Sequence, residues 1–149
     1  MIRFILISIC LKNISPIPNP WSMTTLPCKG SSWDFGDGKA IIETPGYPSK
    51  YPTKNKCSWE FIVPPSGSFS IDCASFDLES SDYFCVEDTN NWYYNCWHGK
   101  YTSRFPIPFP YKPTMMRNAV TVSFWSNEQK TGQGFRFVIL LRRFSFYHF

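Results

Sequence analysis

Apolar and polar residues alternate in several short segments of the chain, and this alternation is its main structural signal. In segment 57–63, CSWEFIV, the odd-numbered residues are Cys, Trp, Phe and Val, whereas the even-numbered residues are Ser, Glu and Ile. Successive side chains of a β-strand point to opposite faces of a sheet, so a segment of this kind buries one face. The pattern predicts a half-buried strand with Trp59 and Phe61 in the core.

The same alternation predicts strands in the rest of the chain, and no long segment shows the apolar period of a helix. Phe124 is expected in the core with Trp59 and Phe61. The turn-forming segment PPSG at 64–67 predicts an antiparallel hairpin from the strands on either side of it. The segment TNN at 89–91 predicts a second tight turn. The further strands are expected at 39–43, 68–73, 84–88, 92–96, 119–125 and 135–141.

Composition supports a single all-β domain. The 149 residues suit one domain better than two, and aromatic residues make up 19% of the chain, with 13 Pro and 8 Gly. Bulky aromatic residues and frequent turn formers favour strands over helices. The net charge is only +4, and the basic residues are scattered apart from the pair Arg142 and Arg143. Nucleic-acid binding is therefore not expected.

The cysteines and the N-terminus indicate a secreted protein. Six cysteines in a chain of this size point to an oxidising compartment. The alternative is a zinc site, but Cys85 and Cys96 lie too far apart for a CxxC pair, and neither histidine has zinc-finger spacing. At the N-terminus, MIRFILISICL resembles the start of a signal peptide and is too short to span a bilayer. The alternative is a start site that precedes a longer protein.

Residues 44–59, TPGYPSKYPTKNKCSW, resemble the CUB domain, an extracellular module in which Ser/Thr-Pro-x-Tyr-Pro and Tyr-Pro precede Cys-x-Trp. The resemblance implies an antiparallel, jelly-roll-like β-sandwich with two sheets. The resemblance covers a CUB-like domain at 28–141. The apolar N-terminal run and the polar, proline-rich residues after it give a leader at 1–20 and a linker at 21–27, and residues 142–149 form a tail of unassigned role. Four further segments match the family in order: SFDLE at 75–79, CVED at 85–88, NAVTVSFWSN at 118–127 and GQGF at 132–135.

The resemblance also implies two disulfide bonds, Cys28–Cys57 and Cys85–Cys96. The second pair lies closer together than is usual for the family, so the hairpin between its members is expected to be short. Cys73 is an additional cysteine. It is either a buried thiol or a partner for Cys85, for Cys96 or for a cysteine of another chain.

A calcium site is a further implication of the resemblance. Many CUB domains hold the ion with a Glu before the third Cys, the Asp of Cys-x-x-Asp, and an Asp after a later strand. The matching residues here are Glu79, Asp88 and Asn127. Calcium prefers several oxygen ligands, and a neutral amide at Asn127 is expected to lower its affinity. The alternative is that Glu79 and Asp88 are ordinary solvated carboxylates.

No catalytic signature is present: the sequence has neither a nucleophile elbow nor a phosphate-binding loop, so an enzyme is not expected. We expect a secreted binding module that recognises an extracellular protein or a glycan through loops at one end of the sandwich. Two alternatives are the non-catalytic fragment of a larger CUB-containing serine protease and a matrix component crosslinked through Cys73. The candidate contact residues are the aromatics Tyr47, Tyr51, Trp92 and Trp97.

Overall fold

The computed structural model describes residues 23–30, 32–34, 38–63, 65, 67–72, 75–88, 90, 92–101 and 118–143. In these residues the chain forms strands and turns without a helix. The strands are β1 (Thr24–Thr25), β2 (Ser32–Trp33), β3 (Gly38–Glu43), β4 (Lys56–Val63), β5 (Gly67–Asp72), β6 (Phe76–Asp77), β7 (Tyr83–Asp88), β8 (Tyr93–Trp97), β9 (Lys100–Tyr101), β10 (Asn118–Trp125) and β11 (Gly134–Arg143).

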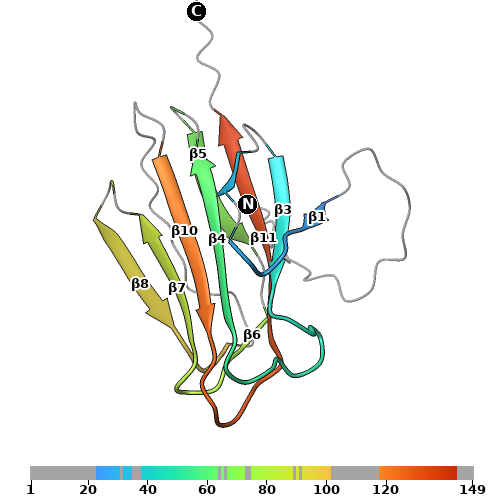
Figure 1. Cartoon of the computed structure of the whole chain (residues 1–149). Coiled ribbons are helices and arrows are strands. Elements are labelled where there is room, and N and C mark those ends of the chain that lie inside the picture. Colours follow the sequence, from blue (N-terminus) through green and yellow to red (C-terminus); the bar gives the residue numbers. More distant parts are fainter. Residues whose placement is uncertain are drawn as a thin grey trace, which may run out of the picture.

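The strands form two sheets that face each other (Figure 1). One sheet has the order β1-β3-β11-β6-β9, with β5 also paired to β11, and the other has the order β2-β4-β10-β7-β8. Pairing is antiparallel except that β1 joins β3, and β2 joins β4, in parallel. This arrangement confirms the predicted all-β sandwich with two sheets.

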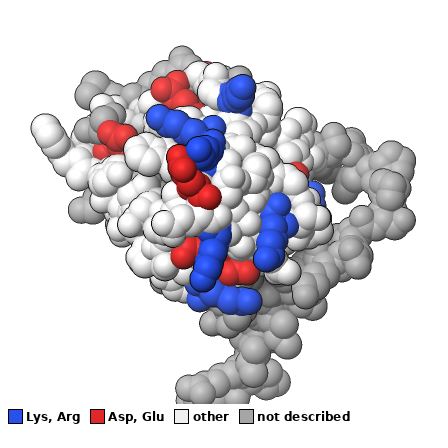
Figure 2. Space-filling view, turned by 60° about the horizontal axis from the view of Figure 1, so that its bottom comes forward, with Lys and Arg blue, Asp and Glu red and all other residues white. Residues whose placement is uncertain are grey.

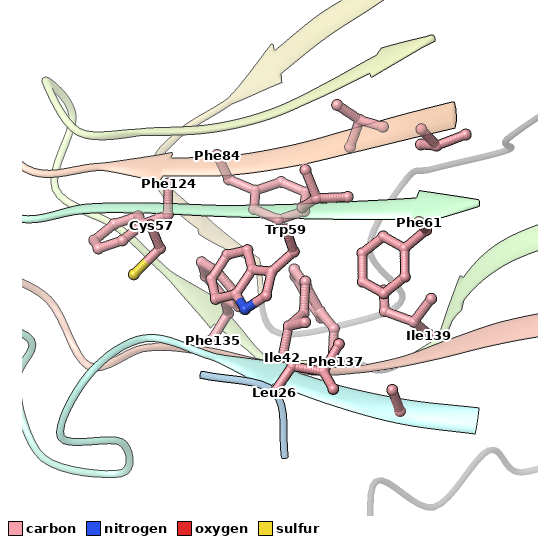
Figure 3. Packing of buried hydrophobic residues seen from close by; sticks show 14 of the residues in the cluster. Leu26, Ile42, Cys57, Trp59, Phe61, Phe84, Phe124, Phe135, Phe137 and Ile139 are labelled. Carbon is pink, nitrogen blue, oxygen red and sulfur yellow. The ribbon is translucent and has the colours of Figure 1, made fainter. Parts of the chain in front are cut away.

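The core lies between the two sheets and is largely aromatic (Figure 3). Trp59, Phe61 and Phe124 are fully buried, as their parity in the sequence predicts. Phe135 of β11 meets these residues from the opposite sheet, with its ring centroid 5.7 Å from that of Phe124. β4 and β10 supply every second residue to the core, so the alternation in their sequences reflects their place in the sandwich.

Two disulfide bonds join the predicted cysteines. Cys28–Cys57 fastens the N-terminal segment to the start of β4, and Cys85–Cys96 crosses between β7 and β8. The first bond closes a loop with a sequence separation of 29, and a loop of that size adds about 3–4 kcal/mol through the entropy of the unfolded chain. Cys73 lies outside the described residues.

The hairpin predicted around segment 64–67 is wrong. β5 pairs with β11 rather than with β4, so the chain crosses from one sheet to the other after Val63. The rings of Phe61 and Phe69 still meet across the core, with centroids 5.5 Å apart. Strand parity is the same for both arrangements, which is why alternation alone could not separate them. The predicted hairpin of β7 and β8 is confirmed.

The domain includes residues on both sides of its predicted bounds. Thr24 and Thr25 were expected in a linker but form β1, and Leu26 is buried in the core. The Leu26 N–H donates to the Ile41 carbonyl at 2.8 Å. At the other end, β11 runs to Arg143, two residues past the predicted end at 141. The predicted leader at 1–20 and residues 144–149 of the tail lie outside the described residues.

Gly134 begins β11 at a point of close approach to Thr44. Its φ of 83° lies in the left-handed region, and a Cβ at this position would overlap the Thr44 side chain. Thr44 is fully buried, and its Oγ1 accepts the Phe135 N–H at 3.2 Å. Both the backbone conformation and the space therefore require glycine.

We predict that Gly134→Ala lowers the free energy of unfolding by at least about 2 kcal/mol, because it adds backbone strain and a steric overlap. Urea denaturation followed by tryptophan fluorescence measures the loss. Gly30→Ala is the matched control: a Cβ there meets no atom within 4 Å, so its effect should stay within about 0.5 kcal/mol. Equal effects of the two changes would contradict the prediction.

Candidate functional site

Three loops meet at one end of the sandwich, the lower end in Figure 1, which we call the loop end. They are loop 44–55 between β3 and β4, loop 78–82 before β7, and loop 126–133 between β10 and β11. The strand register brings them together. Trp125 at the end of β10 pairs with Tyr83 at the start of β7 and with Lys56 at the start of β4.

The buried carboxylate of Asp82 lies at the centre of the loop end. Asp82 has no exposed surface. Its Oδ2 accepts the Tyr51 hydroxyl at 2.6 Å, and its Oδ1 accepts the main-chain N–H of Asn127 at 2.8 Å. Asp82 therefore links loop 78–82 to both of the other loops.

Tyr51 joins this carboxylate to the aromatic core. Its ring is 1% exposed and packs edge-on against Phe124, with centroids 5.1 Å apart. Its hydroxyl also accepts the Glu79 N–H at 2.9 Å. Burial, which disfavours the phenolate, raises the pKa of Tyr51 to about 12, and the hydrogen bond to Asp82 acts in the same direction. The hydroxyl is therefore a neutral donor throughout the physiological range.

Glu79 carries a half-buried carboxylate at the loop end. Its Oε2 accepts the Ser81 hydroxyl at 2.6 Å and the Ser81 N–H at 2.9 Å, and its Oε1 accepts the Ser80 hydroxyl at 2.9 Å. These hydrogen bonds, led by that of the Ser81 hydroxyl, lower the pKa of Glu79 to about 2. The group is thus anionic and held in one orientation.

Asn127 completes the connection from the third loop. Its Nδ2 donates to Ser81 Oγ at 2.8 Å, and its Oδ1 accepts the Gln129 N–H at 2.7 Å. The Lys54 N–H donates to the Asn127 carbonyl at 2.7 Å. We call the five connected residues the loop-end network: Tyr51, Glu79, Ser81, Asp82 and Asn127.

The structure brings Glu79 and Asn127 together but does not place Asp88 beside them. Asp88 pairs with Val120 at the far end of β7, about 17 Å from Tyr83 along a strand of this length. It is buried there, where its Oδ1 accepts hydrogen bonds from the Asn118 side chain and the Asn90 N–H. The acidic residue directly before β7, at the loop end, is Asp82. The Cys-x-x-Asp spacing in the sequence points to Asp88, and no motif singles out Asp82.

Two of the four predicted contact aromatics belong to the core. Tyr51 and Trp97 are 1% and 9% exposed, so neither ring is available to a partner. Tyr47 is half-buried in loop 44–55. Trp92 is 95% exposed with a φ of 53°, at the β7–β8 turn and thus at the end of β7 away from the loop end.

A shallow hollow lies beside Glu79, and its rim carries both signs of charge. Figure 2 shows Lys and Arg interspersed with Asp and Glu over this end of the molecule. Asp77 accepts the Gln133 N–H at 3.4 Å, and its Oδ2 lies 3.8 Å from the Lys100 ammonium. The polar side chains that line the hollow are Lys50, Asp77, Glu79, Lys100, Lys130, Thr131 and Gln133.

The loop-end network does not fit a calcium ion as it stands. Calcium takes about six to eight oxygen ligands, several of them charged. The network has two carboxylates, and both oxygens of Asp82 already accept protein hydrogen bonds. Asn127 turns an amide N–H toward Ser81. No group of three His, Cys, Asp or Glu able to hold a metal occurs among the described residues.

The sequence model of the CUB domain family matches residues 28–138. The chain therefore belongs to the CUB domain family. Tolloid-like protein 2 of Mus musculus is 30% identical over 99 residues, which cover 64% of this chain and 10% of that protein. The chain thus spans about a tenth of the length of this relative.

Two solved structures show the same fold. The CUB1-EGF-CUB2 domain of human MASP-1/3 matches with a TM-score of 0.60 at 16% identity, over 78% of this chain and 43% of that one. The MASP-1 CUB2 domain bound to Ca²⁺ matches with a TM-score of 0.51 at 17% identity, over 76% and 99%.

Membership of the family indicates the general type of module that this chain forms. CUB is a non-catalytic module of extracellular proteins, some of which carry enzymatic domains elsewhere, and the described residues contain no catalytic domain. Its two disulfide bonds suit an oxidising compartment. None of the described residues belongs to a helix that is long and apolar enough to cross a membrane.

We predict that the Glu79 carboxyl titrates with a pKa of about 2, and that Ser81→Ala moves this pKa toward the ordinary value for glutamate. The change removes the hydroxyl that contributes most to stabilising the anion. Carbon-13 NMR of the side-chain carboxyl, followed as the pH is lowered, measures both values. An unchanged pKa in Ser81→Ala would contradict the assigned cause.

We predict that Tyr51→Phe lowers the free energy of unfolding by about 1–3 kcal/mol, because the buried Asp82 carboxylate loses a donor. Tyr83→Phe, on a ring that is 41% exposed, is the control and should change stability by less than about 0.5 kcal/mol. Urea denaturation of both variants at neutral pH decides the point, and equal stabilities would contradict it.

The raised pKa of Tyr51 also predicts how its contribution to stability changes with pH. The pKa of Tyr51 is raised above that of an unfolded tyrosine, so its contribution is complete below about pH 10 and is lost as the pH rises toward 12. The stability difference between the wild type and Tyr51→Phe should therefore shrink over that interval.

Proposed function

We propose that the chain is a secreted, non-catalytic module that binds an extracellular protein through its loop end. The observation that carries the proposal is the Glu79 carboxylate, which lines the charged hollow and is held by hydrogen bonds. Hydrogen bonds to Ser80 and Ser81 fix its orientation before any partner arrives. A group ordered in advance loses little conformational entropy on binding.

Glu79 is suited to receive a lysine or an arginine of the partner. Its carboxylate is ionised at physiological pH because its pKa is lowered to about 2. Charge-assisted hydrogen bonds of this kind are stronger than neutral ones, and they fix the register of an interface. The Glu79 main-chain N–H donates to the Tyr51 hydroxyl at 2.9 Å. Since the Tyr51 ring is buried in the core, this bond connects Glu79 to the core.

The mixed charge of the hollow favours a protein over a glycan. Among the described residues, Lys50 and Lys130 take part in no ion pair. Both line the hollow with Glu79. A partner that offers a basic group to Glu79 and acidic groups to these lysines would match the surface. A neutral sugar chain offers neither sign, and a uniformly acidic polymer would be repelled by Glu79.

A second candidate places this module inside a larger protein, such as a CUB-containing secreted serine protease, where it would have no catalytic role itself. The small share of Tolloid-like protein 2 that the chain spans, 10%, favours this arrangement. Sequencing the complete transcript tests it. A complete reading frame that includes a catalytic domain, on either side of this module, supports this candidate, and a complete reading frame without one rejects it.

We predict that Glu79→Gln weakens partner binding by about tenfold or more, because the variant loses the charge of one buried ion pair at the interface. The measurement is crosslinking of the secreted domain to proteins of the extracellular fluid, compared by quantitative mass spectrometry. Glu87→Gln is the matched control, since Glu87 is exposed on β7 away from the loop end. Partners captured equally by both variants would contradict the loop-end contact.

A further inference from the structure

The loop end differs from the calcium site that the family resemblance implies at one decisive position. The calcium site implied by the resemblance has an acidic residue after the β10 strand, whereas this chain has Asn127 there. The MASP-1 CUB2 domain, which shares the fold, was solved bound to Ca²⁺. Contacts other than calcium ligands must therefore be considered for the three loops of this chain.

The contacts of Asn127 fix which way its amide points. The main-chain N–H of Gln129 can only donate, so the side-chain atom 2.7 Å away is the amide oxygen. The amide nitrogen therefore faces Ser81 Oγ at 2.8 Å. Asn127 thus presents hydrogens, rather than oxygen lone pairs, to the side of the network where Glu79 lies.

Donors and acceptors alternate without conflict from this point. Ser81 Oγ receives the Asn127 hydrogen and donates its own to Glu79 Oε2 at 2.6 Å. On the other side of the network, Asp82 accepts the Asn127 main-chain N–H and the Tyr51 hydroxyl. A cation could reach Asp82 only by displacing these donors, because Asp82 has no exposed surface. Each carboxylate is therefore satisfied by protein hydrogens.

We infer that the loop-end network joins the three loops without calcium. Asn127 is the residue on which this depends, because its amide donates to Ser81 and its main-chain N–H donates to Asp82. An aspartate at 127 would have no side-chain hydrogen for Ser81, and it would add a third negative charge beside Glu79 and Asp82. Three carboxylates at one end repel each other unless a cation lies between them. The inference does not depend on the partner proposed above.

Thermal unfolding of the secreted wild type and of Asn127→Asp, each in excess chelator and in millimolar calcium, tests the inference. The wild type should melt within about 1 °C of the same temperature in both conditions. Asn127→Asp should melt about 4 °C lower in chelator, as expected for a loss near 1 kcal/mol in a domain of this size, and calcium should restore it. Asn90→Asp, the same substitution near Asp88 at the far end of β7, should show no calcium dependence.

A second variant covers the case in which Asn127→Asp is not secreted. Asn127→Ala removes the hydrogen donor without adding charge, so its melting temperature should fall equally in calcium and in chelator. Terbium luminescence of the wild type, with calcium as competitor, checks binding directly and should show no displaceable signal. A wild-type shift of several degrees that Asp82→Asn abolishes, a calcium-displaceable terbium signal, or a folded Asn127→Asp indifferent to calcium would each overturn the inference.

Discussion

The loop end depends on one buried carboxylate. Asp82 has no exposed surface, and a buried charge without hydrogen-bond donors would cost several kcal/mol. Tyr51 and the main chain of Asn127 supply those donors, and each comes from a different loop. The contacts that replace the water of Asp82 are therefore the same contacts that fix loops 44–55 and 126–133 against loop 78–82.

This arrangement is possible because the aromatic core extends as far as the loop end. The Tyr51 ring packs on Phe124, and Phe124 packs on Phe135 of the opposite sheet. The phenol is thus held by the sandwich, and its hydroxyl reaches the carboxylate at a fixed position. Gly134 allows Phe135 to enter the core beside the buried Thr44. A change in this part of the core should accordingly disturb the loop end as well as the stability of the fold.

The sequence was sufficient to predict the seven longer strands, because a half-buried strand leaves a period of two in its residues. The sequence did not predict β1, β2, β6 and β9, which have two residues each. It was not sufficient to predict which strands pair. β4 and β5 both send apolar residues into one core, where Phe61 meets Phe69, and the short turn between them suits either a hairpin or a crossing between sheets. Pairing depends on hydrogen bonds with β10 and β11, which lie far away in the sequence.

Once the pairing of β7 with β10 is known, antiparallel geometry places the site residues more closely than motif spacing does. A residue just before β7 and a residue just after β10 must lie at the same end when the two strands are antiparallel neighbours, which pairs Asp82 with Asn127 and sends Asp88 to the other end. The orientation of the Asn127 amide is different in kind. It is set by the main-chain N–H of Gln129, and only a folded loop brings that donor to the amide oxygen. The loop conformation therefore decides, as much as the residue type does, whether residue 127 turns oxygen lone pairs or amide hydrogens toward the network.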